Sequence, residues 1–226
     1  MKTRNLLAII SVLTCGMFSV SAAHAIPIFV NNFSFETIPG GGFPFGCGTN
    51  CSYSIAPIPG WLVTGAGATG QFRPGPPTNT TYFDFVPDGI TVAYTNDGTI
   101  SQIVGSTVQL GFTYTLMVDQ GVRHDYAVDP GLIELVIGLN PPIFATGVPA
   151  APFSGRWSTY TATYVGTAGD VGKTIGISLL SSGPQGDWDN VRLNAVGPNA
   201  VPEPASLALL GLGLAAFAVT RRRIKA

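Results

Sequence analysis

The chain has 226 residues, enough for one domain of ordinary size together with its targeting segments. Its formal charge is −1, but the region from residue 26 to 200 carries five basic and eleven acidic side chains, a net charge of −6. An acidic surface without a basic patch argues against binding to nucleic acid and to anionic lipid headgroups, and it suits metal cations or neutral sugars better.

The N-terminus has the features of a secretory signal peptide. Basic residues in the first four positions precede a long apolar stretch, and Ala23 and Ala25 occupy the −3 and −1 positions of a cleavage site. We therefore expect residues 1–25 to be removed on export. The apolar stretch is too short, and too close to that site, to be preferred as a transmembrane helix. Cys15 raises the alternative of a lipoprotein signal, but its surroundings fit such a site poorly.

Between residues 26 and 196 apolar and polar side chains alternate with a period of two, which indicates half-buried β-strands. No long stretch shows the 3.6-residue apolar period of a helix. The apolar faces of the clearest expected strands are Phe112, Tyr114, Leu116 and Val118; Ile133, Leu135, Ile137 and Leu139; Tyr160, Ala162 and Tyr164; Ile175, Ile177 and Leu179; and Val191, Leu193 and Ala195. The sequence therefore predicts an all-β domain over residues 26–196, an antiparallel jelly-roll β-sandwich.

Two segments, residues 38–59 and 65–87, are so rich in Gly and Pro that we expect long surface loops there in place of strands. The first segment holds Cys47 and Cys51, the two cysteines that remain after signal removal. In an oxidising compartment this pair is expected to form a structural disulfide that closes a small loop. A metal site would need further soft ligands, and the sequence offers no third cysteine or nearby histidine.

The C-terminus combines a linker, an apolar segment and a basic cluster. The linker, residues 197–204, ends in the motif Val201-Pro202-Glu203-Pro204, and residues 205–226 hold an apolar run of 16 residues followed by three arginines and a lysine. By the positive-inside rule the basic end stays in the cytoplasm, so we expect residues 205–226 to form a transmembrane helix. Because the run is short against a hydrocarbon core of about 30 Å, a span would need membrane thinning or snorkelling. A buried amphipathic helix is the alternative.

These features resemble the sorting tail of the PEP-CTERM proteins of Gram-negative bacteria. The resemblance implies that Pro-Glu-Pro is a recognition site for an exosortase, a membrane transpeptidase, and it associates the chain with exopolysaccharide and biofilm surfaces. We therefore expect an exported protein that is anchored in the inner membrane before processing and then lies at the cell surface or in the extracellular matrix. The match covers the last 26 residues and leaves the activity open.

The two ends of the predicted domain carry motifs that suggest a cation site. Asn31-Asn32-Phe33-Ser34-Phe35-Glu36 opens the domain, and Asp187-Trp188-Asp189-Asn190-Val191 lies near its close. Together they resemble the galactose-binding-like jelly rolls of many carbohydrate-binding modules, and the resemblance implies that Glu36 and Asp189 are ligands of a structural calcium ion. First and last strands lying side by side would also bring together the oxygen ligands that Ca²⁺ prefers. Asp187 is a further candidate ligand. The alternative is that these acids are turn or edge residues.

A polar loop is the clearest candidate for ligand binding. The segment from Asp119 to Tyr126 follows a predicted strand and crowds ionisable side chains into one loop, where binding residues often lie. Sugars present apolar C–H faces beside hydroxyl groups, so Tyr126 with Arg123 and Asp125 could hold one, and Trp157 could add an aromatic face if exposed. The alternative is that the tryptophans of the chain are core residues.

Residues 92–125 also resemble the calcium-binding Stig cyclases of cyanobacteria, through Gly98-Thr99-Ile100-Ser101-Gln102 and Gly121-Val122-Arg123-His124-Asp125. Those enzymes have a jelly-roll fold and rearrange indole-isonitrile terpenoids, with an acid catalyst that the sequence does not place on a definite residue here. Because a membrane anchor fits poorly with small-molecule biosynthesis, we interpret this resemblance as shared fold.

Sequence motifs for nucleophilic catalysis are absent. The exported region has one histidine, His124, and no Gly-x-Ser-x-Gly elbow, and no spacing singles out a pair of carboxylates for glycoside hydrolysis. We therefore predict a non-enzymatic surface protein, with no catalytic residues, that binds carbohydrate or matrix through a calcium-stabilised jelly roll. Two alternatives stay open: an enzyme on the same fold (a glycan lyase, hydrolase or cyclase), and a purely structural surface component.

Overall fold

Residues 25–75, 82–125, 131–183 and 185–198 are described by a computed structural model of the protein, and they belong to a unit that runs from Ala25 to Pro198. The predicted signal peptide up to His24, the Pro-Glu-Pro motif and the predicted transmembrane helix lie outside the described residues. Within the described ranges, no helix is long and apolar enough to cross a membrane.

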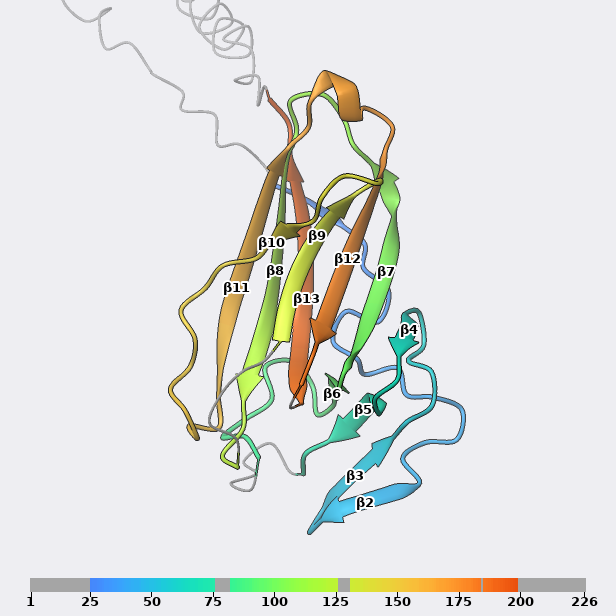
Figure 1. The fold of residues 1–226 in the computed structure, drawn as a ribbon, viewed down its shortest axis with the longest axis vertical. Coiled ribbons are helices and arrows are strands. Elements are labelled where there is room, and N and C mark those ends of the chain that lie inside the picture. Colours follow the sequence, from blue (N-terminus) through green and yellow to red (C-terminus); the bar gives the residue numbers. More distant parts are fainter. Residues whose placement is uncertain (1–24, 76–81, 126–130, 184, 199–226) are drawn as a thin grey trace, which may run out of the picture. The chain divides into compact units, whose positions relative to one another are not determined.

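The described residues form two antiparallel sheets and one short 3₁₀ helix (Figure 1). The elements are β1 (Ile26–Ile28), β2 (Phe45–Gly48), β3 (Cys51–Ser54), β4 (Leu62–Gly65), β5 (Thr69–Arg73), β6 (Val92–Thr95), β7 (Gly98–Thr107), β8 (Thr113–Val122), β9 (Gly131–Ile137), β10 (Ile143–Phe144), β11 (Arg156–Val165), η1 (Ala168–Asp170), β12 (Thr174–Ser181) and β13 (Gly186–Val196). The eight-stranded sheet has the order β11-β8-β13-β6-β5-β3-β2, with β1 paired to β13, and the five-stranded sheet has the order β10-β9-β12-β7-β4. The predicted all-β sandwich is confirmed.

The main core fills the space between the two sheets. Leu116 on β8, Leu135 on β9 and Leu179 on β12 are fully buried in it, as the period-two pattern predicted. The prediction for Leu139 was wrong, because β9 ends at Ile137 and Leu139 is fully exposed in the turn that follows. The alternation in the sequence continues for two residues after the strand hydrogen bonds end.

The expectation of loops throughout residues 38–59 and 65–87 was also wrong. Strands β2, β3 and β5 lie in these segments and extend the eight-stranded sheet beyond β6. Glycine allows one of these pairings, because a Cβ added at Gly70 of β5 would lie 1.9 Å from the carbonyl oxygen of Ser54 on β3. The predicted disulfide between Cys47 and Cys51 is present and joins β2 to β3.

A second apolar cluster lies on the outer face of the eight-stranded sheet. Ala93 of β6 faces the main core, whereas Val92 and Tyr94 point the other way and pack with Phe72 and Phe83. Phe83 comes from the segment that leads to β6, so this segment covers part of the outer face. The cluster lies near the end of the sandwich at which β8 finishes and β13 begins.

Candidate functional site

An open pocket of about 300 Å³ lies beside the second apolar cluster. Its lining combines four aromatic rings with two amides and a guanidinium group: Tyr53, Phe72, Tyr82 and Tyr94, then Asn96, Gln185 and Arg123, together with Cys47 and Ala68. A second hollow, on the five-stranded sheet around Ile103 and Gly176, has no ionisable lining residue. Concave sites that join apolar walls to a few convergent polar groups are typical of ligand binding, so the first pocket is the candidate site.

Three neighbouring strands place the aromatic wall. Tyr53 of β3 is paired with Phe72 of β5, and the Tyr94 ring of β6 contacts both, with centroid separations of 6.3 Å and 5.8 Å. The Tyr94 hydroxyl donates a hydrogen bond to the carbonyl of Ser54 (3.3 Å). Burial, followed by the nearby Tyr53 and Asp187, raises the pKa of Tyr94 to about 12, so this hydroxyl stays protonated at neutral pH.

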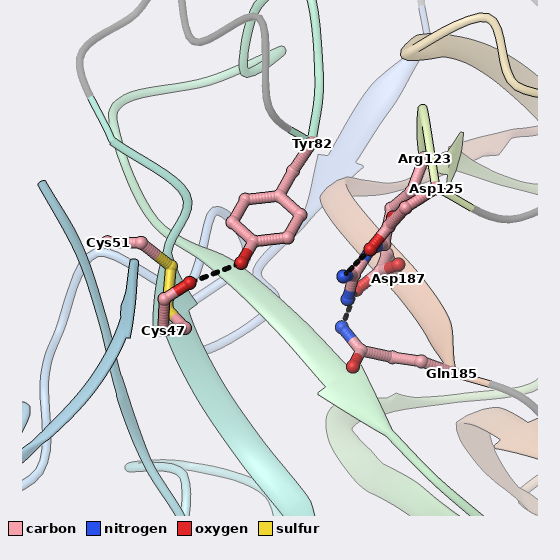
Figure 2. Close-up of a disulfide and its surroundings, with 7 residues drawn as sticks. All are labelled: Cys47, Cys51, Tyr82, Arg123, Asp125, Gln185 and Asp187. Carbon is pink, nitrogen blue, oxygen red and sulfur yellow. Dashed lines mark hydrogen bonds and ion pairs between the residues drawn. A yellow bond between two sulfur atoms is a disulfide. The ribbon is translucent and has the colours of Figure 1, made fainter. Parts of the chain in front are cut away.

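Tyr82 connects the disulfide to the polar side of the pocket. Its hydroxyl donates a hydrogen bond to the carbonyl of Cys47, and the Arg123 guanidinium lies 4.4 Å from its ring centroid. Arg123 also donates two hydrogen bonds to Asp125, of 2.7 and 2.6 Å. Figure 2 shows the disulfide and Tyr82 on one side of this region, with Arg123 and Asp125 on the other. The arginine is thus held between an aromatic face and a carboxylate that offsets its charge.

Asp187 lies next to this ion pair and is almost completely buried (Figure 2). Its Oδ1 accepts a hydrogen bond from Gln185 (2.7 Å), and its Oδ2 is buried without a hydrogen-bond partner among the described residues. Burial raises the pKa of Asp187 to about 7; Arg123 and the Gln185 hydrogen bond oppose the rise and Asp125 adds to it. The carboxyl is therefore present in both protonation states near neutral pH.

The other predicted binding residues have different environments. Trp157 is half-buried: its ring lies 4.6 Å from that of Phe83, and its indole N–H donates to the carbonyl of Phe85 (2.8 Å). It therefore holds the segment that covers the sheet and does not line the pocket. Tyr126 lies outside the described residues. Trp61 and Trp188 are core residues, as the alternative interpretation held.

Of the predicted calcium ligands, Glu36 lies close enough to Asp189 for its charge to act on the Asp189 carboxyl. Asp189 is fully buried, and its carboxylate accepts hydrogen bonds from the backbone N–H groups of Asp88 (2.8 Å) and Asn190 (2.7 Å). Burial, followed by the charges of Asp88 and Glu36, raises its pKa to about 8, while the two backbone hydrogen bonds lower it. Glu36 accepts hydrogen bonds from the N–H groups of Ile90 and Thr91, both of 2.7 Å.

These three acids, Glu36, Asp88 and Asp189, are called the acidic corner below. Asp187 does not belong to it, because the charges that influence Asp187 are those of Arg123 and Asp125. Among the described residues no three His, Cys, Asp or Glu side chains surround a common point as metal ligands would. A carboxyl whose pKa is raised by burial, and further by neighbouring acids, would be stabilised in its charged form by a nearby cation.

Sequence reasoning missed most of the pocket lining. Tyr53 and Phe72 lie in segments that we interpreted as loops, and Tyr82 and Gln185 carry no local motif. The one available signal was the alternation of Val92 and Tyr94 around Ala93, which places the valine and the tyrosine on one face of the strand but does not say which face meets the main core.

The xylan-binding domain CBM22-1 of Xyn10C from Paenibacillus barcinonensis superposes with a TM-score of 0.45 at 12% identity, covering 78% of this chain and 97% of that domain. The tandem CBM22-1-CBM22-2 structure of the same enzyme gives 0.47 at 12% identity, covering 79% of this chain and 49% of that one. No curated protein sequence matches the chain significantly.

Two family models match the sequence. The PEP-CTERM protein-sorting motif matches residues 200–223, which confirms the resemblance of the tail to PEP-CTERM sorting tails and marks the chain for sorting to the cell surface. The second model covers almost the whole sandwich and agrees with the cyclase resemblance of residues 92–125. By this match, over residues 26–194, the chain belongs to the HpiC1-like family, described as HpiC1 cyclase.

Proposed function

We propose that this protein is an exported surface protein that binds a neutral carbohydrate in the aromatic pocket. One observation carries the proposal: the rings of Tyr53, Phe72, Tyr82 and Tyr94 converge with the planar polar groups of Arg123 and Gln185 in one open pocket. Aromatic faces pack against the C–H faces of a sugar ring, and amide and guanidinium groups hydrogen-bond to its hydroxyls.

The charge balance of the pocket favours a neutral ligand. Asp125 offsets the charge of Arg123 through two hydrogen bonds, and Asp187 is partly protonated near neutral pH because its pKa is about 7. Neither acid lines the pocket, but together they offset the charge of the lining residue Arg123, so a charged ligand would find little net attraction there. A hydroxyl-rich ligand needs neither charge, and it can hydrogen-bond instead to the Asn96 and Gln185 amides that line the pocket.

The position of the pocket suits presentation at a surface. Gln185 and Arg123 lie where β13 begins and β8 has just ended, whereas the chain leaves the domain at Pro198, after the other end of β13. The sorting tail therefore departs from the end of the strands that lies away from the pocket. In our proposal the tail holds the protein in the inner membrane until an exosortase-type transpeptidase processes it, and the pocket faces away from the membrane.

Calcium is part of the proposal as a structural ion at the acidic corner. Glu36 and Asp189 would hold it, with Asp88 as a neighbour that the sequence did not indicate. When bound, the ion would supply positive charge to the Asp189 carboxylate, whose ionisation is disfavoured by burial and, in addition, by its acidic neighbours. The acidic corner links three segments of the chain, because the carboxylates of Glu36 and Asp189 both accept backbone hydrogen bonds from the segment that runs from Asp88 to Thr91.

The test is a glycan-array screen of the mature chain, followed by calorimetry with the best ligand. Tyr53→Ala removes one aromatic wall and should weaken binding by about tenfold, the value of a partly buried aromatic face. Leu62→Ala, on the exposed side of the five-stranded sheet, is the matched control and should leave affinity unchanged. A folded chain that binds no glycan, or equal weakening by both variants, would contradict the proposal.

A second candidate function is acid catalysis, and Asp187 is the observation that favours it. A buried carboxyl with a pKa of about 7 beside an aromatic pocket has the properties of a general acid, and the chain belongs to a cyclase family. The test is incubation with an indole-isonitrile terpenoid and a search for an isomeric product of unchanged mass. Turnover should fall as the pH rises through about 7 and should be lost in Asp187→Asn; a product that survives this substitution would exclude Asp187 as the acid.

A further inference from the structure

We propose that the end of the sandwich from which the sorting tail departs rests on a phospholipid surface through exposed apolar side chains. Five such side chains, each more than half exposed, form what we call the apolar rim: Ile26, Leu110, Leu139, Val165 and Val171. Solvent-exposed apolar residues are ordinary when scattered, and others as exposed, such as Ile103 and Val148, lie elsewhere on the domain. The rim differs from them because its five side chains lie at the end from which the tail departs.

Backbone pairing shows that the rim residues share one end of the sandwich. Ile26 of β1 is paired with Ala195, near the end of β13. The turn of Leu110 is joined to the segment after Val165, since the N–H of Gly111 donates to the carbonyl of Gly166 (2.8 Å). The turns of Leu139 and Val171 are linked to their neighbours in the same way, through Gly138 to Thr174 and Gly172 to Val108, both at 2.9 Å. Figure 1 shows these turns together at the top of the sandwich, around η1.

The charged side chains in the turns at this end of the sandwich offset each other. The turns that carry the rim contain one acid and one base, Asp170 and Lys173, and these two form an ion pair of 2.7 Å. The hydrogen bonds of Lys173, Thr167, Tyr164 and Asn140 hold the pKa of Asp170 well below its usual range. These turns therefore carry no net charge, and removal of the signal peptide would leave one positive α-amino group on Ile26, so docking does not require a strongly anionic lipid surface.

The short linker between the domain and the apolar tail segment favours a lipid surface as the partner of the apolar rim. Only six residues, 199–204, separate Pro198 from the apolar segment that begins at Ala205. Six residues span at most about 20 Å when fully extended. If the tail enters the membrane, as our proposed function holds, this short linker keeps the rim close to the lipid surface. Leu, Ile and Val side chains then gain free energy by leaving water for the boundary between headgroups and acyl chains.

Tryptophan quenching tests this contact in the mature chain that retains its tail, reconstituted in phosphatidylcholine vesicles. Leu139→Trp and Val171→Trp place a reporter on the rim, and Ile103→Trp places one at an exposed position on the five-stranded sheet. With brominated lipids the two rim reporters should lose most of their added emission and shift to the blue, whereas the control reporter should keep its emission. Anionic phosphatidylglycerol should change none of these results.

A second variant tests whether the quenching depends on the apolar side chains of the rim. Adding Leu110→Ser and Val171→Ser to the Leu139→Trp chain removes apolar area around the reporter, and it should restore most of the quenched emission. Flotation of the same vesicles tests the anchoring separately: a chain that fails to float refutes the anchor, and the rim proposal falls with it. A floating chain with unquenched rim reporters overturns the rim proposal alone. A blue shift that also occurs without vesicles would overturn it in favour of contact between copies of the chain.

Discussion

Replacing Asp187 by Asn should stabilise the protein, by an amount that grows with pH. Burial raises the pKa of Asp187 from its ordinary 3.8 to about 7. A carboxyl that binds its proton more tightly in the folded chain stabilises the fold most at low pH, and this contribution is lost as the pH rises from about 4 to about 7. At about 1.4 kcal/mol per pH unit, the loss amounts to about 4 kcal/mol. Asn keeps the oxygen that accepts the Gln185 hydrogen bond and cannot ionise.

Urea denaturation at pH 4, 6 and 8 measures this difference. The free energy of unfolding of Asp187→Asn, relative to the unsubstituted protein, should rise by about 4 kcal/mol between pH 4 and pH 8. Asp97→Asn is the control: Asp97 is exposed in the turn between β6 and β7, and its φ of 62° is one that Asn tolerates well. Parallel stability curves for Asp187→Asn and the unsubstituted protein would refute the reasoning, because they would show that folding does not change the affinity of Asp187 for its proton.

Three further perturbations test the fold and the acidic corner. Replacing Cys47 and Cys51 together by Ser should lower the free energy of unfolding by about 2 kcal/mol, from the entropy of closing a short loop, in denaturation under non-reducing conditions; an unchanged midpoint would contradict this. Leu116→Ala should cost about 2–5 kcal/mol because Leu116 is fully buried between the sheets, and a smaller loss would mean that the core collapses around the gap. Removing calcium with a chelator at pH 8 should lower the melting temperature, and less so at pH 5, where Asp189 with its pKa of about 8 is protonated; equal melting curves with and without chelator at pH 8 would exclude the ion.

Local pattern was a reliable guide wherever a strand is long and half-buried. The alternation around Leu116, Leu135 and Leu179 predicted which side chains enter the core, because the period of a strand is fixed by its backbone geometry. Short strands gave no such signal. The four residues of β3 and the five of β5 lie in segments rich in Gly and Pro, and they are strands because neighbouring strands provide hydrogen-bond partners.

Patterns in the sequence were enough to predict the class of fold, the disulfide, and the sorting signal at the C-terminus. Each depends on residues close together in the chain: alternating side chains, two cysteines four positions apart, and a tail motif. The pocket depends on the tertiary structure, because its lining residues come from β2, β3, β5, β6, connecting segments between strands, and the residues next to the ends of β8 and β13. The protonation state of Asp187 also depends on the tertiary structure. A pKa near 7 results from removing a carboxyl from water, and burial depends on the packing of strands that are distant in the sequence.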